Sequence, residues 1–145
     1  MKRYSFWRDA LFHYVQGVAR KPFAWGDHDC ALFAAGAVAA MTGEDFGAPY
    51  RGKYKTMRGG LRLLKRKGFA DHAALAASLF EEIHPSKAQV GDIAAIEEDG
   101  HVALGIVQGP RIYVLRPGAA GIGTVGLLEA KRAFQVPFKE ELHHE

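Results

Sequence analysis

The sequence predicts a single α+β domain, with helices in the first half of the chain and an antiparallel sheet in the second. Apolar residues recur at spacings of three and four in the first half, whereas short runs bounded by glycine and proline follow residue 90. No repeat and no Ser/Gly/Pro-rich linker divides the 145 residues. Helices that precede strands are typical of the α+β class. We expect one domain over residues 1–138 and a frayed polar tail over 139–145.

The first predicted helix runs from a cap at Ser5 to about Ala19, before Pro22. Its apolar residues recur at spacings of four, four and three: Trp7, Leu11, Val15 and Val18. One face of this helix should therefore pack on a core.

The second predicted helix covers residues 30–41, with Asp29 as its cap and Thr42-Gly43 as its end. Alanine and larger apolar residues surround it on every side. A helix of this kind is expected in the middle of a fold.

Two further helices are predicted before the sheet. One covers residues 56–67 and ends at Gly68, with Met57, Leu61 and Leu64 facing inward and basic residues outward. The next begins after Asp71, runs from His72 to about Ile83, and stops before Pro85.

Strands are predicted over residues 91–96, 101–107 and 111–115, with two more over 124–128 and 133–136. A tight turn at Gln108-Gly109-Pro110 joins the second strand to the third. If Val107 pairs with Arg111 across this turn, His101 lies opposite Pro117.

The single cysteine, Cys30, is the first candidate for chemistry. It follows the helix cap Asp29, so its sulfur should lie near unpaired backbone N–H groups and the positive end of the helix dipole. That environment favours a thiolate, and we expect iodoacetamide to label Cys30 well below pH 8. The alternative is a buried structural thiol, because free cysteine also behaves as a small hydrophobe.

The second candidate is His101, which opens a strand 71 residues after Cys30 and could serve as its base. His28 lies close in sequence but on the same turn, so it should not face the thiol squarely. We interpret the remaining histidines as solvated surface: His13, His72, His84, His143 and His144.

Three segments of the chain resemble the NlpC/P60 family of cysteine peptidases. They are Pro22-Phe23-Ala24-Trp25-Gly26-Asp27-His28-Asp29-Cys30-Ala31-Leu32, Gly91-Asp92-Ile93 and Gly100-His101-Val102-Ala103-Leu104-Gly105-Ile106-Val107. Family members carry Tyr-x-Trp-Gly, Asp-Cys-Ser-Gly, Gly-Asp and His-Val-Gly-Ile in this order. The chain is similar above all to a small branch encoded among the tail components of phages and gene transfer agents.

The resemblance implies a papain-like fold, with Cys30 at the start of a central helix packed on an antiparallel sheet. It implies cleavage of peptide bonds in peptidoglycan stem peptides, with Cys30 as nucleophile, His101 as general base and then acid, and no cofactor. Trp25 would contact the substrate. Peptidoglycan and tail proteins of a phage or gene transfer agent would be the partners.

Two positions depart from the family pattern. Phe23 replaces the tyrosine whose hydroxyl assists the oxyanion, so backbone N–H groups, with Asp29 and His28 as support, would have to hold that charge. The third catalytic position also lacks its polar acceptor, because Leu115, Arg116 and Pro117 offer none. A backbone carbonyl, Gln108 or Tyr113 would then orient His101. These departures favour the alternative of a catalytically inactive binding or structural component of a tail.

Charge is unevenly placed along the chain. Residues 51–67 hold eight basic residues and no acid, although the formal net charge is only +3. A solvated helix face explains this run, and so would attraction to an anionic wall polymer or an acidic partner through Arg58, Arg62 and Lys65. Nucleic acid is not expected, since only Tyr50 and Tyr54 are interleaved. No ligand spacing typical of a metal site occurs.

The N-terminus does not read as a signal peptide, because Arg8 and Asp9 interrupt any apolar run. The longest apolar stretch, residues 30–41, is shorter than the roughly 20 residues of a spanning helix. We therefore expect a soluble protein made in the cytoplasm, which could join a virion or transfer-agent particle.

Overall fold

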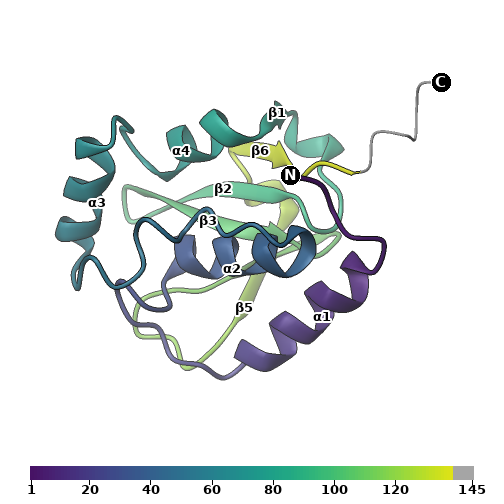
Figure 1. Ribbon diagram of the computed structural model, residues 1–145, viewed down its shortest axis with the longest axis horizontal. Coiled ribbons are helices and arrows are strands. Elements are labelled where there is room, and N and C mark those ends of the chain that lie inside the picture. Colours follow the sequence, from purple (N-terminus) through teal and green to yellow (C-terminus); the bar gives the residue numbers. More distant parts are fainter. Residues whose placement is uncertain (139–145) are drawn as a thin grey trace.

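The computed structural model describes residues 1–138 and confirms the α+β class. Its four α-helices precede all six strands along the chain, and the colours of Figure 1 follow this order. They are α1 (Trp7–Val18), α2 (Cys30–Thr42), α3 (Met57–Arg66) and α4 (His72–Leu79). The predicted tail at 139–145 lies outside the described residues.

Six strands form one antiparallel sheet in the order β1-β6-β2-β3-β4-β5. Their bounds are β1 (Glu81–Ile83), β2 (Ile93–Glu98), β3 (His101–Val107), β4 (Arg111–Val114), β5 (Gly123–Gly126) and β6 (Arg132–Gln135). Two short 3-10 turns, Pro85–Lys87 and Leu127–Glu129, link the strands. β2 and β3 form the centre of the sheet and share the longest register.

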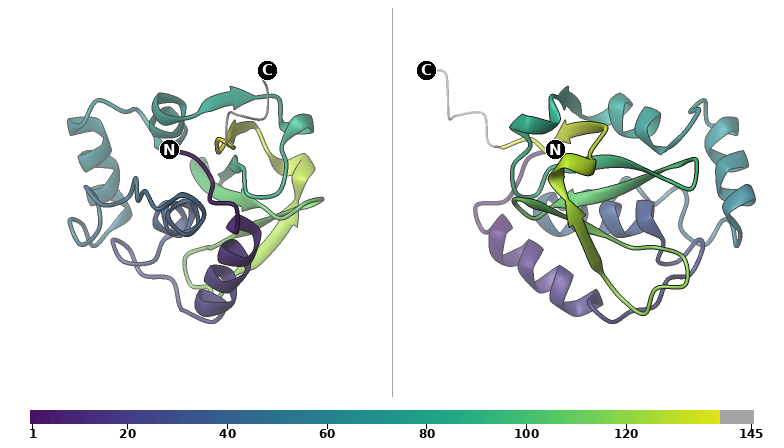
Figure 2. Two further views of the ribbon diagram at one scale, coloured as in Figure 1. Left: turned by 45° about the vertical axis from the view of Figure 1, so that its right-hand side comes forward. Right: turned by 180° about the vertical axis from the view of Figure 1, so that it is seen from behind.

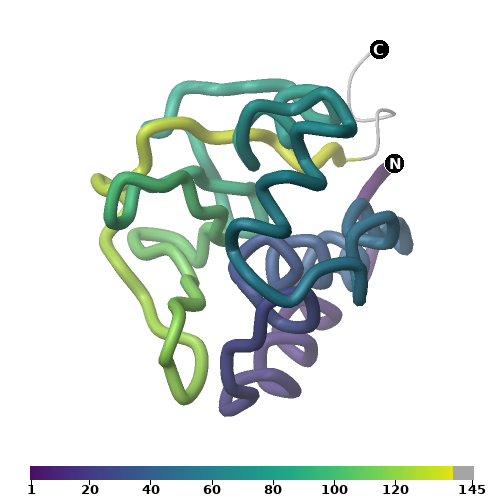
Figure 3. The backbone as a smooth tube through the Cα atoms, turned by 90° about the vertical axis from the view of Figure 1, so that its left-hand side faces the viewer, coloured from purple at the N-terminus to yellow at the C-terminus, as the bar shows by residue number. Residues whose placement is uncertain are grey.

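The helices and the sheet form two layers. In Figure 3 most of the helical part of the chain lies on one side and the strands lie on the other. The left view of Figure 2 looks along the axis of α2 and shows this helix beside the sheet. The main core lies between these layers, where α1 and α2 meet alternate residues of β3 such as Leu104 and Ile106. A second apolar cluster, which includes Val107 and Ile112, covers the opposite face.

The predicted central helix is confirmed. Asp29 caps α2 by accepting a hydrogen bond from the N–H of Leu32, and Gly43 ends it in a left-handed conformation. A Cβ on Gly36 would come within 2.2 Å of the Tyr14 hydroxyl oxygen, so glycine at this position lets α1 approach α2 closely. Small residues thus allow α2 to sit deep in the core.

Two predicted helix limits are wrong. Ser5 is not the cap of α1; Phe6 is, and its side chain makes no capping hydrogen bond. The fourth helix stops at Leu79 instead of about Ile83, because Phe80 is extended and buries its ring in the core. Residues 81–83 then become β1 by pairing with β6.

The Gly91-Asp92 motif precedes β2 and joins distant parts of the chain. Asp92 accepts hydrogen bonds from the N–H groups of Gln89 and Val136 and forms a buried ion pair with Arg3, whose nitrogen lies 2.8 Å away. The role of Asp92 in this structure is therefore to fix the sheet at one end. Across residues 1–138, no helix is both long and apolar enough to cross a membrane.

Candidate active site

A cleft of about 540 Å³ opens between the start of α2, the start of α4 and the end of the sheet where β3 begins. Cys30, His72 and His101 all line it, together with Trp25. The sequence predicted three of these four residues as site residues. The structure brings them together with a histidine that the sequence assigned to the surface.

The cleft exists because β4 separates from β3. The two strands pair only at Ile106 with Tyr113 and at Val107 with Ile112. The predicted pairing of Val107 with Arg111 is therefore wrong by one residue, since the turn contains one residue more. Leu115, Arg116 and Pro117 leave the sheet and line the cleft near His101.

Cys30 is the first residue of α2 and faces the cleft. The residue keeps some solvent exposure, but protein atoms enclose the thiol itself, and this burial raises its pKa to about 12. Asp29 acts in the same direction, whereas backbone hydrogen bonds from Leu104 and Ala31 favour the thiolate. The expected lowering of the pKa by the helix start is therefore wrong, because desolvation of the sulfur outweighs the dipole.

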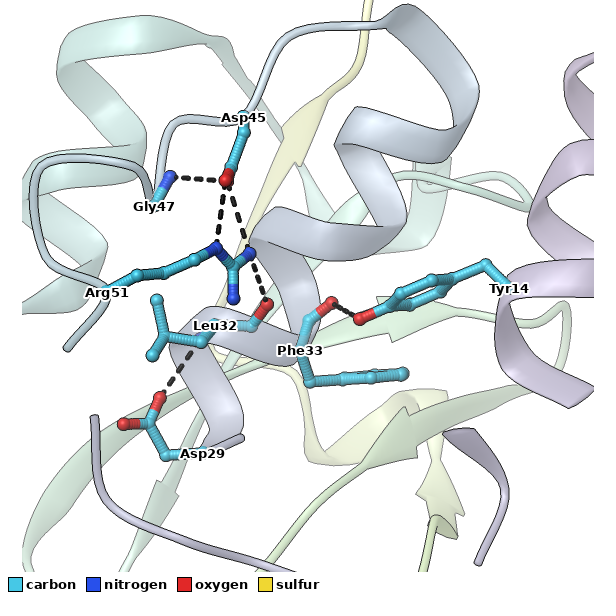
Figure 4. Close-up of polar contacts among 7 residues, drawn as sticks. All are labelled: Tyr14, Asp29, Leu32, Phe33, Asp45, Gly47 and Arg51. Carbon is cyan, nitrogen blue, oxygen red and sulfur yellow. Dashed lines mark hydrogen bonds and ion pairs between the residues drawn. The ribbon is translucent and has the colours of Figure 1, made fainter. Parts of the chain in front are cut away.

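The first turns of α2 are braced from both sides (Figure 4). Arg51 donates to the carbonyl oxygen of Leu32 and to the carboxylate of Asp45. Tyr14 donates to the carbonyl oxygen of Phe33 from the opposite side. These contacts hold the segment that carries Cys30 in one position, and they take Arg51 out of the exposed basic surface.

Asp29 acts as a structural hub beneath Cys30. Besides Leu32, it accepts hydrogen bonds from the N–H of Gly26 and the hydroxyl of Tyr54. Gly26 has a positive φ of 79°, and a Cβ there would lie 1.9 Å from the carbonyl oxygen of Tyr54. Sequence analysis missed Tyr54. Its phenol reaches the start of α2 from a different segment than position 23, where the family pattern has its tyrosine. Its hydroxyl bonds Asp29 and does not line the cleft.

His28 is buried and turned away from the cleft. Its ring lies edge-on to Phe33 with centroids 6.3 Å apart, and its Nε2 has no hydrogen-bond partner among the described residues. Burial lowers its pKa, so the neutral ring is favoured. A ring in this position packs in the core, and it does not support an oxyanion in the cleft.

His101 stands at the exposed mouth of the cleft. It opens β3 opposite Glu98, which in turn forms an ion pair with Arg116. It also borders a shallower groove of about 430 Å³ beside α3, together with Arg58, Arg62 and Lys65. The predicted basic side chains therefore lie next to the predicted catalytic histidine.

Gln108 and Tyr113 lie near the opposite end of β3 from His101. Gln108 is in the turn after Val107, and Tyr113 pairs with Ile106. Neither residue lines the cleft. In this structure they are too far along the strand to orient His101, because each strand residue adds about 3.3 Å.

His72 is the site residue that sequence analysis missed. It is the first residue of α4, directly after the cap Asp71, and its Nδ1 is buried without a partner within the described part of the chain. Burial lowers its pKa, while a backbone hydrogen bond with Val102 opposes that change. The surface interpretation of His72 is wrong. The sequence feature that could have identified His72 is the pair Asp71-His72. As in Asp29-Cys30, a capping aspartate is followed by a reactive residue at the first position of a helix.

The model of one protein family, Domain of unknown function (DUF6950), matches residues 2–136. The chain belongs to this family. No curated protein matches it. The sequence similarity by itself therefore assigns this DUF6950 protein no activity.

A solved structure places the DUF6950 fold among known ones. The crystal structure of the NlpC/p60 domain of peptidoglycan hydrolase SagA aligns with 89% of this chain and 95% of its own, with a TM-score of 0.54 and 14% sequence identity. At this identity the likeness concerns the fold. Residues 1–138 of the DUF6950 protein contain no group of three or more His, Cys, Asp or Glu residues suited to a metal ion.

Proposed function

We propose that the protein is a cysteine peptidase of NlpC/P60 type that cleaves peptide bonds in peptidoglycan stem peptides. The observation that carries the proposal is the cleft, which a cysteine at a helix start and two histidines on surrounding elements all line. Such a combination is what nucleophilic catalysis by a thiol requires. The fold shared with a peptidoglycan hydrolase domain supports the choice of substrate.

In the proposed reaction, the Cys30 sulfur attacks a carbonyl carbon of the stem peptide while its proton passes to an imidazole of the cleft. In this proposal the N–H groups of Ala31 and Leu104, which favour negative charge on Cys30, also donate to the oxyanion. A protonated His101 gives its proton to the leaving amine. His101 then takes a proton from water, which attacks the thioester and releases the acid.

The walls of the cleft suit a peptide rich in carboxylates. Trp25 and Phe23 pack edge to face, with ring centroids 4.6 Å apart, and form an apolar wall beside Cys30. Arg58, Arg62 and Lys65 on α3 border the adjoining groove and offer positive charge. We infer that the acyl part of the substrate lies along Trp25 and that its carboxylates face α3.

The test is digestion of purified sacculi followed by mass spectrometry of the soluble products. Wild-type protein should release muropeptides, and Cys30→Ser should release none. His101→Gln should slow release by about 100-fold or more, because general acid–base catalysis contributes that much. His13→Gln, on the exposed face of α1, is the matched control and should retain the wild-type rate. Absence of products from every sacculus chemistry tried would refute the proposed function.

A second candidate is an inactive binding component of a phage or gene-transfer-agent tail. The raised pKa of Cys30 and the placement of Phe23 where the family pattern has tyrosine favour it. In this case, the double variant Arg62→Glu/Lys65→Glu should abolish binding to a purified acidic tail protein, whereas Cys30→Ser should leave binding unchanged. An active peptidase could also be carried by a tail, so the sacculus assay, in which only a peptidase releases muropeptides, separates the two candidates.

A further inference from the structure

We propose that His72 is a catalytic residue, the imidazole that accepts the Cys30 proton as the thiol attacks its substrate. This inference rests on the proposed function and assigns a step that it left open. His101 still protonates the leaving amine and takes a proton from the attacking water. Two histidines on different elements, one half-buried and one exposed, would therefore divide the proton transfers.

The geometry starts from the free edge of β3. The N–H and C=O of Val107 bond Asp92 and Gly91, so the odd-numbered residues of β3 direct their backbone groups toward β2. The backbone groups of Val102 and Leu104 therefore point the other way, toward β4. Because β4 pairs with β3 only as far as Ile106, β4 leaves these groups uncovered.

Cys30 and His72 occupy this edge. The thiol of Cys30 meets the backbone of Leu104, and the ring of His72 meets the backbone of Val102. Two residues that are separated by one position on a strand lie about 7 Å apart, and their backbone groups point to the same side. The sulfur and the imidazole are thus held by neighbouring sites on one strand, at the floor of the same cleft.

The ring of His72 has the chemistry of a base. Its Nδ1 is buried and has no partner among residues 1–138, so in the tautomer that carries the proton on Nε2 a lone pair on Nδ1 is free to accept a proton. Burial favours the neutral ring and the protonated thiol at rest. A neutral pair of this kind needs an acceptor at the moment of attack, and His72 can provide it.

The proton balance closes over one turnover. The Sγ–H bond breaks as the bond from sulfur to the carbonyl carbon forms, and His72 becomes a cation. When water releases the acyl group, the sulfur leaves as the thiolate and recovers the proton from His72. The charged groups that act on the pair are few: Asp29 on both, Glu98 on Cys30, and Asp71 on His72.

The first experiment measures the rate of Cys30 alkylation by iodoacetamide from about pH 5 to about pH 9, a range that spans the titration of histidine. His72→Gln should slow alkylation near neutral pH by about tenfold, because a general base is lost. In the wild-type profile we expect a shoulder below pH 7, where His72 assists alkylation, and this shoulder should be absent from the profile of His72→Gln. His101→Gln should leave both features in place. Equal profiles for wild type and His72→Gln, or a loss confined to His101→Gln, would overturn the assignment.

A second measurement covers the case in which His72→Gln unfolds. The wild-type protein and Cys30→Ala are both labelled with nitrogen-15 histidine and compared by NMR. We expect the signal of His72 Nδ1 to differ between the two proteins and that of His13 to be the same. An unchanged His72 signal contradicts the proposal. Sacculus digestion separates the two ideas. If wild type is inactive but alkylation depends on His72, the peptidase proposal fails and the cysteine–histidine pair stands.

Discussion

The two ends of β3 are built in opposite ways. At the Val107 end, the strand is buried, paired with β2 on one side and β4 on the other, and fixed by the Asp92 ion pair next to it. At the His101 end, β4 has left, and an exposed histidine borders an open cleft. One strand therefore provides both the most rigid part of the core and the wall of the candidate site.

The difference shows how a cleft can form at the edge of one sheet. Pairing that stops after Ile106 leaves backbone N–H and C=O groups free at one edge. Those groups are expensive to bury alone, so side chains with matching chemistry, Cys30 and His72, occupy the edge. Stability is concentrated at one end of the strand, and reactivity is concentrated at the other.

The largest expected effect lies at the rigid end. Arg3→Met should lower the free energy of unfolding by about 3 to 5 kcal/mol, because it leaves the buried Asp92 carboxylate without its cation. The control is Arg132→Met, which breaks an exposed pair with Glu82 and should cost at most about 1 kcal/mol. Urea unfolding of both variants gives the comparison. Similar losses would mean that the buried pair does not fix this end.

The next effect concerns the open end. Native Cys30 should react with iodoacetamide at pH 8 at least about tenfold more slowly than the same residue in denaturant, because burial keeps the thiol protonated. Mass spectrometry of the alkylated chain measures both rates. A faster reaction in the native protein would show that the helix start dominates after all.

A third test adds one methyl group to the rigid end. A Cβ on Gly105 would lie 2.6 Å from the carbonyl oxygen of Tyr113 and 2.7 Å from a methyl carbon of Ile112, so Gly105→Ala should cost about 1 to 3 kcal/mol. Gly123→Ala is the matched strand control, because its nearest neighbour would be 4.0 Å away, and it should cost less than about 0.5 kcal/mol. Thermal unfolding followed by circular dichroism can rank the two.

The smallest effect depends on pH. Burial lowers the pKa of His28, so in mild acid the unfolded chain binds a proton that the folded chain excludes. The free energy of unfolding should therefore fall as the pH drops below about 6.5. His28→Phe should reduce this fall, because a phenyl ring takes up no proton when the chain unfolds. His13→Phe on exposed α1 should leave it unchanged in the same titration of stability.

Local patterns made much of the fold predictable. The cap at Asp29 and the stop at Gly43 fixed α2 within one residue, and the alternation after the Asp99-Gly100 turn gave the bounds of β3. The end of α4 was not predictable from periodicity. Residues 81–83 become a strand only because β6, about fifty residues later, offers them backbone partners. Long-range pairing of this kind leaves little trace in a local sequence pattern.

Most residues of the candidate site could be predicted from the sequence, but the participation of His72 and the direction of the Cys30 pKa shift could not. Cys30, His101 and Trp25 follow from the motifs, and all three line the cleft. His72 was not predicted because its burial depends on the packing of α4 against β3, and the residues next to His72 in the sequence do not indicate this packing. The pKa of Cys30 was given the wrong sign for a similar reason, since desolvation comes from tertiary packing and the helix dipole from local structure.

Arg3 has a mechanical consequence. Its guanidinium carbon lies 4.2 Å from the ring centroid of Trp7 and 4.2 Å from that of Phe138, and its main chain donates to Pro137, so the first and last described segments lie side by side. A pull that separates these two segments would load the Arg3 contacts and then peel β6 from the sheet. The Arg3 contacts lie at the Val107 end of β3, so this load is applied away from the Cys30 cleft.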